Sequence, residues 1–125
     1  MRHTVLVIDD QWSMQELARI VLQSAGYRVL LAGDGATGLS LARTQHPDVL
    51  VLDWHMLGMH GPDVLRGLHQ DPHTAVIPVI LITTEACAMQ LPLGVASCLQ
   101  KPFHPQALLT VVDNVLRREE MPMAV

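Results

Sequence analysis

Acidic, hydroxyl and ammonium side chains follow short apolar runs at several places in this chain. They are Asp9, Asp10, Asp53, Thr83, Thr84 and Lys101. Three carboxylates brought together would repel one another, since two unit charges ~4 Å apart cost ~4 kcal/mol at an effective dielectric constant of ~20. A cation is therefore expected among them. An all-oxygen ligand set that leaves room for water and a phosphate favours Mg²⁺.

The same residues supply the parts for phosphoryl transfer. Lys101 offers a point charge for one phosphoryl oxygen, and Thr83 offers a hydroxyl donor for another. An aspartate can serve as the covalent acceptor, and catalysis of such a transfer consists mostly of positioning and charge neutralisation. Each residue alone also has an ordinary explanation, such as a turn after a strand, so the interpretation depends on their joint placement.

A parallel sheet would bring these residues together. Apolar runs rich in β-branched residues alternate with longer segments of helical periodicity, which predicts an α/β domain whose parallel sheet is covered on both faces. In such a sheet, ligands bind beyond the carboxyl ends of the strands. The predicted strands are Thr4–Ile8, Tyr27–Leu31, Val49–Leu52, Val79–Ile82 and Ala96–Leu99.

The first predicted helix has the clearest pattern. Its apolar residues recur at three- and four-residue steps from Met14 to Ala25. Ser13 and Glu16 have the spacing of a capping box, and Gly26 fits the end of the helix.

Three further helices are marked by prolines near their ends. One runs from about Ala36 to Thr44, and two begin at Gly61-Pro62 and His104-Pro105. The segment Glu85–Gly94 contains Pro92 and has room for about two helical turns, so we expect a short or irregular fourth helix there.

Length and charge limit the class of protein. A chain of 125 residues, half of them hydrophobic, fits one domain over 1–125, with a core at about 4–118 and a tail at 119–125 that is frayed over Met121–Val125. The net charge of −4 argues against direct binding to nucleic acid or to a membrane surface. We see no signal peptide and no apolar stretch near the ~20 residues that span a bilayer, and we expect a cytoplasmic location.

The two cysteines, Cys87 and Cys98, have neither C-x-x-C spacing nor zinc-ligand neighbours. We therefore expect reduced thiols and no disulfide framework, with Cys98 serving as a small buried hydrophobic residue rather than a redox sensor.

Most histidines are interpreted as solvated surface residues, because they lie near prolines in predicted loops or helix ends. These are His46, His69, His73 and His104. His55 and His60 instead flank the predicted acidic site and could modulate it.

In joint order and spacing, these motifs resemble those of the bacterial response-regulator receiver family. The resemblance spans Val5 to Arg118 and is carried by Val7-Ile8-Asp9-Asp10, Leu52-Asp53-Trp54-His55-Met56, Met59 with Gly61, Ile82-Thr83-Thr84 and Leu99-Gln100-Lys101-Pro102-Phe103. It implies a flavodoxin-like (βα)5 fold with a doubly wound five-stranded parallel sheet in the order 2-1-3-4-5. It also implies a two-component phosphorelay domain that switches conformation to control a partner protein or a fused output domain, and that can form a homodimer.

The resemblance also implies a role for each site residue. Asp53 would accept a phosphoryl group from a phosphohistidine on a histidine kinase or a histidine phosphotransfer protein. Asp10, Asp53 and the backbone carbonyl of His55 would ligate Mg²⁺, and Asp9 would hold the ion through water. Such a domain phosphorylates and dephosphorylates only itself, so we do not expect a conventional enzyme.

Other implied roles concern the phosphoryl oxygens. Thr83 and Lys101 would hold these oxygens, with a cis peptide at Lys101-Pro102 aiming the amine inward. His55 and Glu85 occupy the positions at which this family tunes hydrolysis of the aspartyl phosphate.

Three features depart from the family pattern. Leu57 stands where proline is common, so the loop after Asp53 is expected to be less rigid. Cys98 replaces the usual aromatic residue that swings inward behind Thr83, and the segment from Thr83 to Lys101 is about one helical turn short. These departures favour an alternative: a receiver-like interaction module whose output is independent of phosphorylation.

A third hypothesis, an enzyme on the same fold, is disfavoured. A phosphatase with an aspartate nucleophile would need an acid where His55 stands, and a flavin carrier would need a phosphate-binding loop that this sequence lacks.

Overall fold

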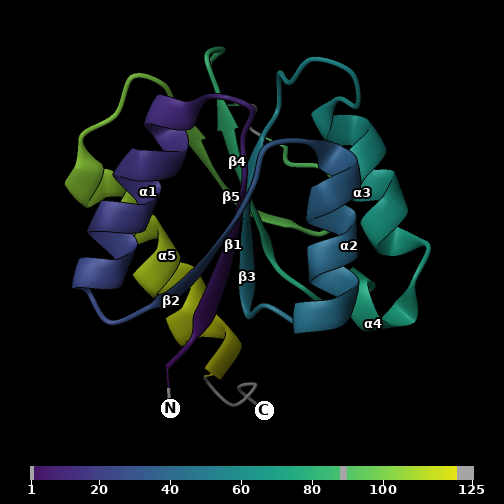
Figure 1. The fold of residues 1–125 in the computed structure, drawn as a ribbon, viewed down its shortest axis with the longest axis horizontal. Helices are drawn as coiled ribbons and strands as arrows, with labels where there is room; N and C mark the ends of the chain where they lie inside the picture. Colours follow the sequence, from purple (N-terminus) through teal and green to yellow (C-terminus); the bar gives the residue numbers. More distant parts are fainter. Residues whose placement is uncertain (1, 88–89, 121–125) are drawn as a thin grey trace.

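Five parallel strands form a single sheet at the centre of the molecule (Figure 1). In this computed structural model, which describes residues 2–87 and 90–120, the strand order is β2-β1-β3-β4-β5. The strands are β1 (Thr4–Ile8), β2 (Arg28–Ala32), β3 (Val49–Asp53), β4 (Val79–Thr83) and β5 (Val95–Gln100). The predicted fold class and strand order are confirmed, and every predicted strand end lies within one residue of the observed one.

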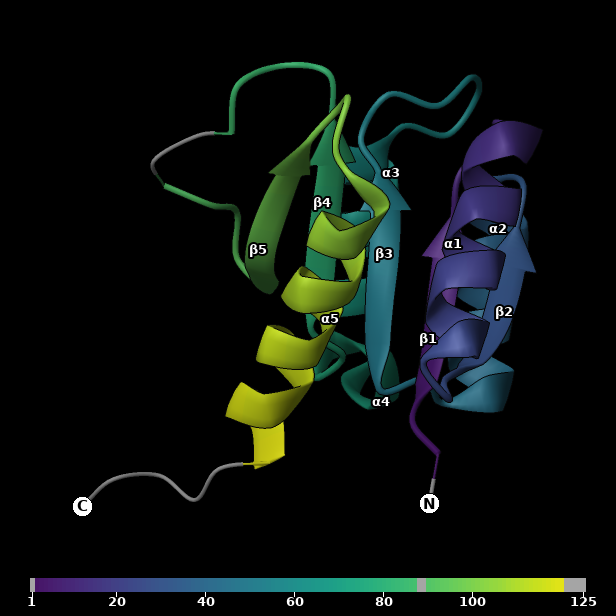
Figure 2. The same cartoon turned by 90° about the vertical axis from the view of Figure 1, so that its left-hand side faces the viewer.

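Helices cover both faces of the sheet. They are α1 (Trp12–Ser24), α2 (Gly35–Gln45), α3 (Gly61–His69), α4 (Pro72–Ala75) and α5 (Pro105–Glu120). Helices α1 and α5 contact each other on one face, and α2 and α3 contact each other on the opposite face (Figures 1 and 2). Because all five strands are parallel, the turns that follow them lie at one end of the sheet, where the polar residues were expected.

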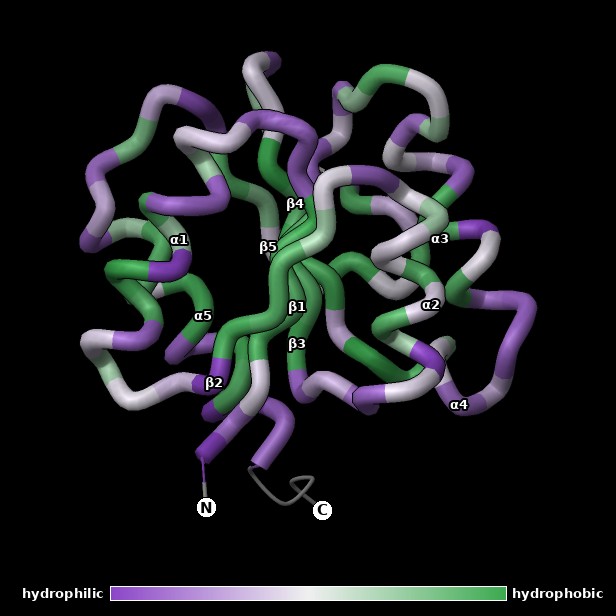
Figure 3. Tube along the Cα trace, viewed as in Figure 1, coloured by the Kyte–Doolittle hydropathy of each residue, from purple (hydrophilic) through white to green (hydrophobic). Residues whose placement is uncertain are grey.

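Alternating side chains of the central strands fill two separate cores, because successive residues of a strand point to opposite faces. Leu6 and Ile8 of β1 belong to the core under α2 and α3, whereas Val5 and Val7 belong to the core under α1 and α5. All five residues of β1, β3 and β4 are buried. The hydrophobic stretches in Figure 3 accordingly run along the strands at the centre of the molecule.

The predicted capping box at the start of α1 is wrong. The helix begins at Trp12 after Gln11, whose side chain makes no capping hydrogen bond. Ser13 is already the second helical residue, and the first turn closes when the Gln15 N–H donates to the Gln11 carbonyl at 3.1 Å. The predicted end is correct, because Gly26 adopts φ +95°, a conformation that suits glycine.

The segment between β4 and β5 contains no helix in its described residues, 84–87 and 90–94, so it is irregular rather than a short helix. The four-residue α4 lies elsewhere, between α3 and β4, and the sequence did not predict it. At the C-terminal end, α5 continues two residues past Arg118 to Glu120. The expected fraying of Met121–Val125 lies outside the described residues.

Cys87 and Cys98 form a disulfide, so the expectation of two reduced thiols is wrong. The pairing follows from the fold. Cys98 lies on β5 opposite Leu81 of β4, and Cys87 follows the end of β4 by four residues. Without a helix to carry it away from the sheet, the chain brings the two Cα atoms to 5.9 Å, which a disulfide can bridge.

Across the described ranges, no helix combines the length and the apolar character needed to span a membrane.

Candidate phosphoryl-transfer site

Three carboxylates meet at the carboxyl end of the sheet. Oxygens of Asp9, Asp10 and Asp53 all lie within 4.8 Å of one another. Asp9 and Asp53 are almost fully buried, with 1% and 5% of their surface exposed, whereas Asp10 is exposed. Asp9 and Asp10 follow β1 and Asp53 ends the neighbouring β3, so the pairing of these two strands brings the acids together.

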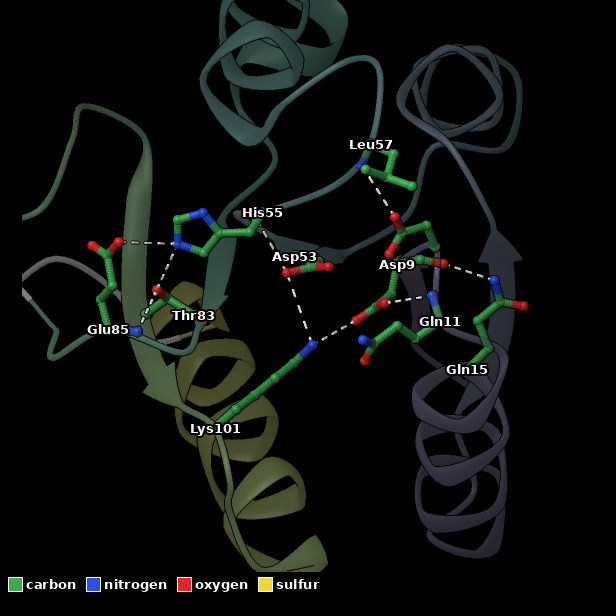
Figure 4. A network of polar contacts seen from close by, with 10 residues as sticks. Asp9, Gln11, Gln15, Asp53, His55, Leu57, Thr83, Glu85 and Lys101 are labelled. Carbon is green, nitrogen blue, oxygen red and sulfur yellow. Dashed lines mark hydrogen bonds and ion pairs between the residues drawn. The ribbon is translucent and has the colours of Figure 1, made fainter.

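Two glutamines at the start of α1, the N-cap Gln11 and Gln15, hold Asp9 in place. The Gln11 N–H donates to Asp9 Oδ1 at 2.8 Å, and the Gln15 side-chain amide donates to the Asp9 backbone carbonyl at 2.7 Å (Figure 4). The first bond orients the buried carboxylate, and the second holds the Asp9 backbone. The role of Gln15 was not predicted from the sequence, because its spacing from Asp9 matches no local motif.

The Asp10 carboxylate is held from the opposite side, by the loop after β3. The Leu57 N–H donates to Asp10 Oδ2 at 3.1 Å. A proline has no N–H and could not make this bond. Leu57 therefore gives the loop an anchor on Asp10, while its own side chain is 87% exposed.

Asp53 lies in an environment that disfavours its charge. Burial raises the pKa of the Asp53 carboxyl above its ordinary value, and the negative charge of Asp9 raises it further. The His55 N–H, 3.2 Å from Asp53 Oδ1, and the nearby Lys101 ammonium both act in the opposite direction. Any additional positive charge would therefore stabilise the ionised form of Asp53.

Lys101 brings a positive charge to two of the three acids. Its Nζ atom lies 3.3 Å from Asp9 Oδ2 and 3.9 Å from Asp53 Oδ1. The peptide bond to Pro102 is cis, as predicted. The Lys101 backbone N–H also donates to the Thr83 carbonyl at 2.7 Å, which joins the chain beyond β5 to the end of β4.

Thr83 begins a second polar group beside the acids. Its Oγ1 accepts the Glu85 N–H at 3.0 Å and lies 3.4 Å from Nε2 of His55. The same His55 nitrogen lies 3.6 Å from Oε1 of Glu85 (Figure 4). His55 and Glu85 thus meet over the Thr83 hydroxyl, where the resemblance placed residues that tune hydrolysis.

The structure brings together the acids and the lysine that the sequence singled out, with Thr83 at the adjacent strand end. Thr84 is exposed, and His60 precedes α3, where its N–H donates to Asp63 at 3.2 Å. The histidines interpreted as surface residues are all exposed: His46, His69, His73 and His104.

Comparisons with known proteins identify the family. The response regulator receiver domain model matches residues 5–113. The DNA-binding response regulator MtrA of Mycolicibacterium smegmatis is 36% identical over 124 residues, which cover 96% of this chain and 53% of that protein. The chemotaxis protein CheY of Pseudomonas aeruginosa is 32% identical, with 91% of this chain and 96% of that protein covered. The solved chemotaxis response regulator CheY4 of Vibrio cholerae superposes with a TM-score of 0.84 at 29% identity, covering 92% and 99% of the two chains.

This chain belongs to the response regulator receiver domain family of two-component systems. It spans about half the length of the MtrA proteins that it matches and nearly the full length of CheY.

Proposed function

We propose that this receiver domain accepts a phosphoryl group on Asp53 from a phosphohistidine, with Mg²⁺ bound, and thereby controls a partner protein or an output domain. The observation that carries the proposal is the position of the Lys101 ammonium, which lies within 4 Å of Asp9 and Asp53 while Asp10 completes the acidic cluster. The acceptor aspartate, the two other acids and the lysine thus lie close together.

The donor set fits Mg²⁺. One ammonium cannot neutralise three clustered carboxylates, and Asp10 is exposed to solvent that could supply the water ligands this ion retains. Asp10, Asp53 and the His55 backbone carbonyl would hold the ion, with Asp9 acting through water. When bound, Mg²⁺ would neutralise charge on the transferring phosphoryl group.

The protein's own residues account for the rest of the transfer. An oxygen of the Asp53 carboxylate attacks phosphorus, so that a P–O bond forms while the P–N bond of the phosphohistidine breaks and the imidazole keeps the electron pair. Lys101 shifts from pairing with carboxylates to pairing with a phosphoryl oxygen. The Thr83 hydroxyl accepts the Glu85 N–H, and its own proton would turn from the nearby His55 ring to donate to the phosphoryl group.

Partners and location follow from this role. The donor would be a histidine kinase or a histidine phosphotransfer protein in the cytoplasm, and this domain would turn over no substrate other than its own aspartyl phosphate. We expect no direct contact of this domain with nucleic acid or a membrane surface, because its net charge is −4.

Acetyl phosphate, a small phosphoryl donor, tests the proposal directly. With Mg²⁺ present, the intact mass should increase by one phosphoryl group, and Asp53→Asn or removal of Mg²⁺ by a chelator should abolish the increase. Labelling that survives Asp53→Asn would refute the assignment of the acceptor.

One observation favours a second candidate, an interaction module whose output ignores phosphorylation. Cys98 stands where the family has its switching aromatic residue, and its disulfide to Cys87 ties that position to the preceding segment. If phosphorylation changed the affinity for a partner by more than about tenfold, or ~1.4 kcal/mol, this second function would be excluded.

A further inference from the structure

The Cys87–Cys98 disulfide lies beside the polar group built on Thr83. Cys87 and Cys98, together with Thr83 and Trp54, line a hollow of about 180 Å³. Cys98 is partly buried and packs against the core under α2 and α3, whereas Cys87 is exposed. The sulfur of Cys98 is thus anchored in the sheet, whereas Cys87, which carries the other sulfur, is open to solvent.

The disulfide closes the short segment Thr84–Cys87 at its far end. The near end is fixed where Thr83 ends β4, and the far end is tied through Cys98 to β5. Between these anchors lies Glu85, whose N–H donates to the Thr83 hydroxyl and whose carboxylate lies 3.6 Å from the His55 ring. Without the disulfide, this segment would be held only as part of the longer connection between β4 and β5, and the greater conformational entropy of that loop would oppose both Glu85 contacts.

We propose that Cys87 and Cys98 form a reversible thiol–disulfide site, reduced by dithiols, whose redox state sets how firmly Glu85 is held against Thr83 and His55. Its effect on phosphoryl chemistry rests on the function proposed above. Disulfides in a reducing compartment are usually transient or redox-sensing, which agrees with a site of this kind.

The exchange is balanced by the dithiol itself. A thiolate of the reductant attacks Sγ of the exposed Cys87, so that a mixed disulfide forms and Cys98 leaves as a thiolate. The second thiol of the reductant then resolves the mixed disulfide. Two electrons and two protons pass to the cysteine pair, and the reductant becomes an intramolecular disulfide.

Dithiothreitol serves as the dithiol for the test. The native oxidised protein should take up no N-ethylmaleimide, and after reduction without denaturant it should take up two equivalents by mass. In the same samples, amide hydrogen exchange at Glu85 should be at least about fivefold faster in the reduced protein. The Trp54 N–H, which donates to the Ile82 carbonyl at 2.9 Å, provides an internal reference that should not change.

The double variant Cys87→Ser/Cys98→Ser supplies the matched control. Its Glu85 exchange should equal that of the reduced protein, with or without dithiothreitol. Equal Glu85 exchange in the oxidised and reduced wild type would overturn the proposal. So would thiols that stay fully alkylatable after treatment with glutathione disulfide, or a disulfide that is reduced only in denaturant.

Phosphorylated protein gives the functional readout. After labelling with acetyl phosphate, the rate of phosphoryl loss should differ at least about twofold between the two redox states, and equal rates would overturn the proposal. A chain that takes up no label in either state would refute the proposed phosphoacceptor function. Glu85 exchange would then decide the redox site by itself, so the two failures are distinguishable.

Discussion

The Nζ atom of Lys101 lies 3.9 Å from Oδ1 of Asp53, although β4 separates β3, which Asp53 ends, from β5, which Lys101 follows. This placement makes Lys101 the fixed cation of the site. In Lys101→Met, the rate of phosphorylation by acetyl phosphate should fall at least about a hundredfold, because a charge aimed at the phosphoryl oxygens is lost. Arg43→Met removes an exposed cation on α2 and should leave the rate unchanged. Equal rates in the two variants would contradict the role of Lys101.

Asp53→Asn should stabilise the metal-free protein at neutral pH. Burial and the Asp9 charge raise the pKa of Asp53, so the folded state favours protonation of this carboxyl more than the unfolded state does. The stabilising contribution of this group is therefore complete below its unfolded pKa of ~4 and is lost as the pH rises through the higher folded value. Urea unfolding with a chelator present should show wild type and Asp53→Asn converging at low pH and separating above that range.

Asp34 provides a control of opposite sign for that experiment. The Thr37 N–H donates to Asp34 Oδ1 at 2.8 Å and lowers the pKa of this carboxyl. Its contribution is present at neutral pH and is lost as the pH falls through the folded value. Asp34→Ala should therefore destabilise the protein at pH 7, and a destabilised Asp53→Asn in the same assay would contradict the account of Asp53.

Thr83→Ala should slow phosphorylation at least about tenfold, because a donor to the phosphoryl group is removed. The Glu85 N–H would also lose its acceptor, at a cost of about 1 kcal/mol in the free energy of unfolding. Thr83→Ser retains the hydroxyl and should keep both properties near those of the wild type. A serine variant as impaired as the alanine variant would point to packing instead of hydrogen bonding.

Tyr27→Phe should cost about 1 kcal/mol in the free energy of unfolding at pH 8, because the phenol donates to the Asp113 carboxylate and ties the start of β2 to α5. Burial, followed by this hydrogen bond, raises the pKa of Tyr27 well above its usual value. Stability from this group is thus lost as the pH rises beyond the unfolded value of ~10. Tyr27 is the single tyrosine, so tyrosinate absorbance reports its titration, and a normal titration midpoint would contradict the prediction.

Gly38→Ala should destabilise the protein by about 1–2 kcal/mol, although alanine normally favours a helix. A Cβ atom at Gly38 would lie 2.3 Å from Cδ1 and 2.7 Å from Cγ1 of Ile8, a fully buried residue. Adding Ile8→Val should recover part of the loss, since valine lacks Cδ1. At Gly33 the nearest atom would lie 3.5 Å away, so Gly33→Ala should show little steric cost in thermal unfolding.

The convergence of the site could be predicted because it depends on strand ends. Parallel strands with buried apolar runs place the residues that follow them on one edge, whatever the details of the helices. Asp9, Asp53 and Lys101 therefore needed only the correct strands and their order. Thr83 was found in the same way, as the last residue of a buried run.

The contacts that refine the site could not be read from residue identities. The Asp10 partner is a backbone N–H that most residues at position 57 would supply, and Gln15 reaches Asp9 through the geometry of the β1–α1 turn. The disulfide was missed for a related reason. The path of the segment after Thr83 has no periodicity, so nothing in its pattern shows that Cys87 turns back toward Cys98.

The hydrogen bond from the Lys101 amide to the Thr83 carbonyl, 2.7 Å long, joins two strand ends at the residues that would grip a phosphate. A ligand that displaces either side chain would therefore strain the hydrogen bond that joins the two residues. A small shift of one strand along its neighbour would then move both Thr83 and Lys101. Motion there would be concerted, with β4 and β5 travelling together.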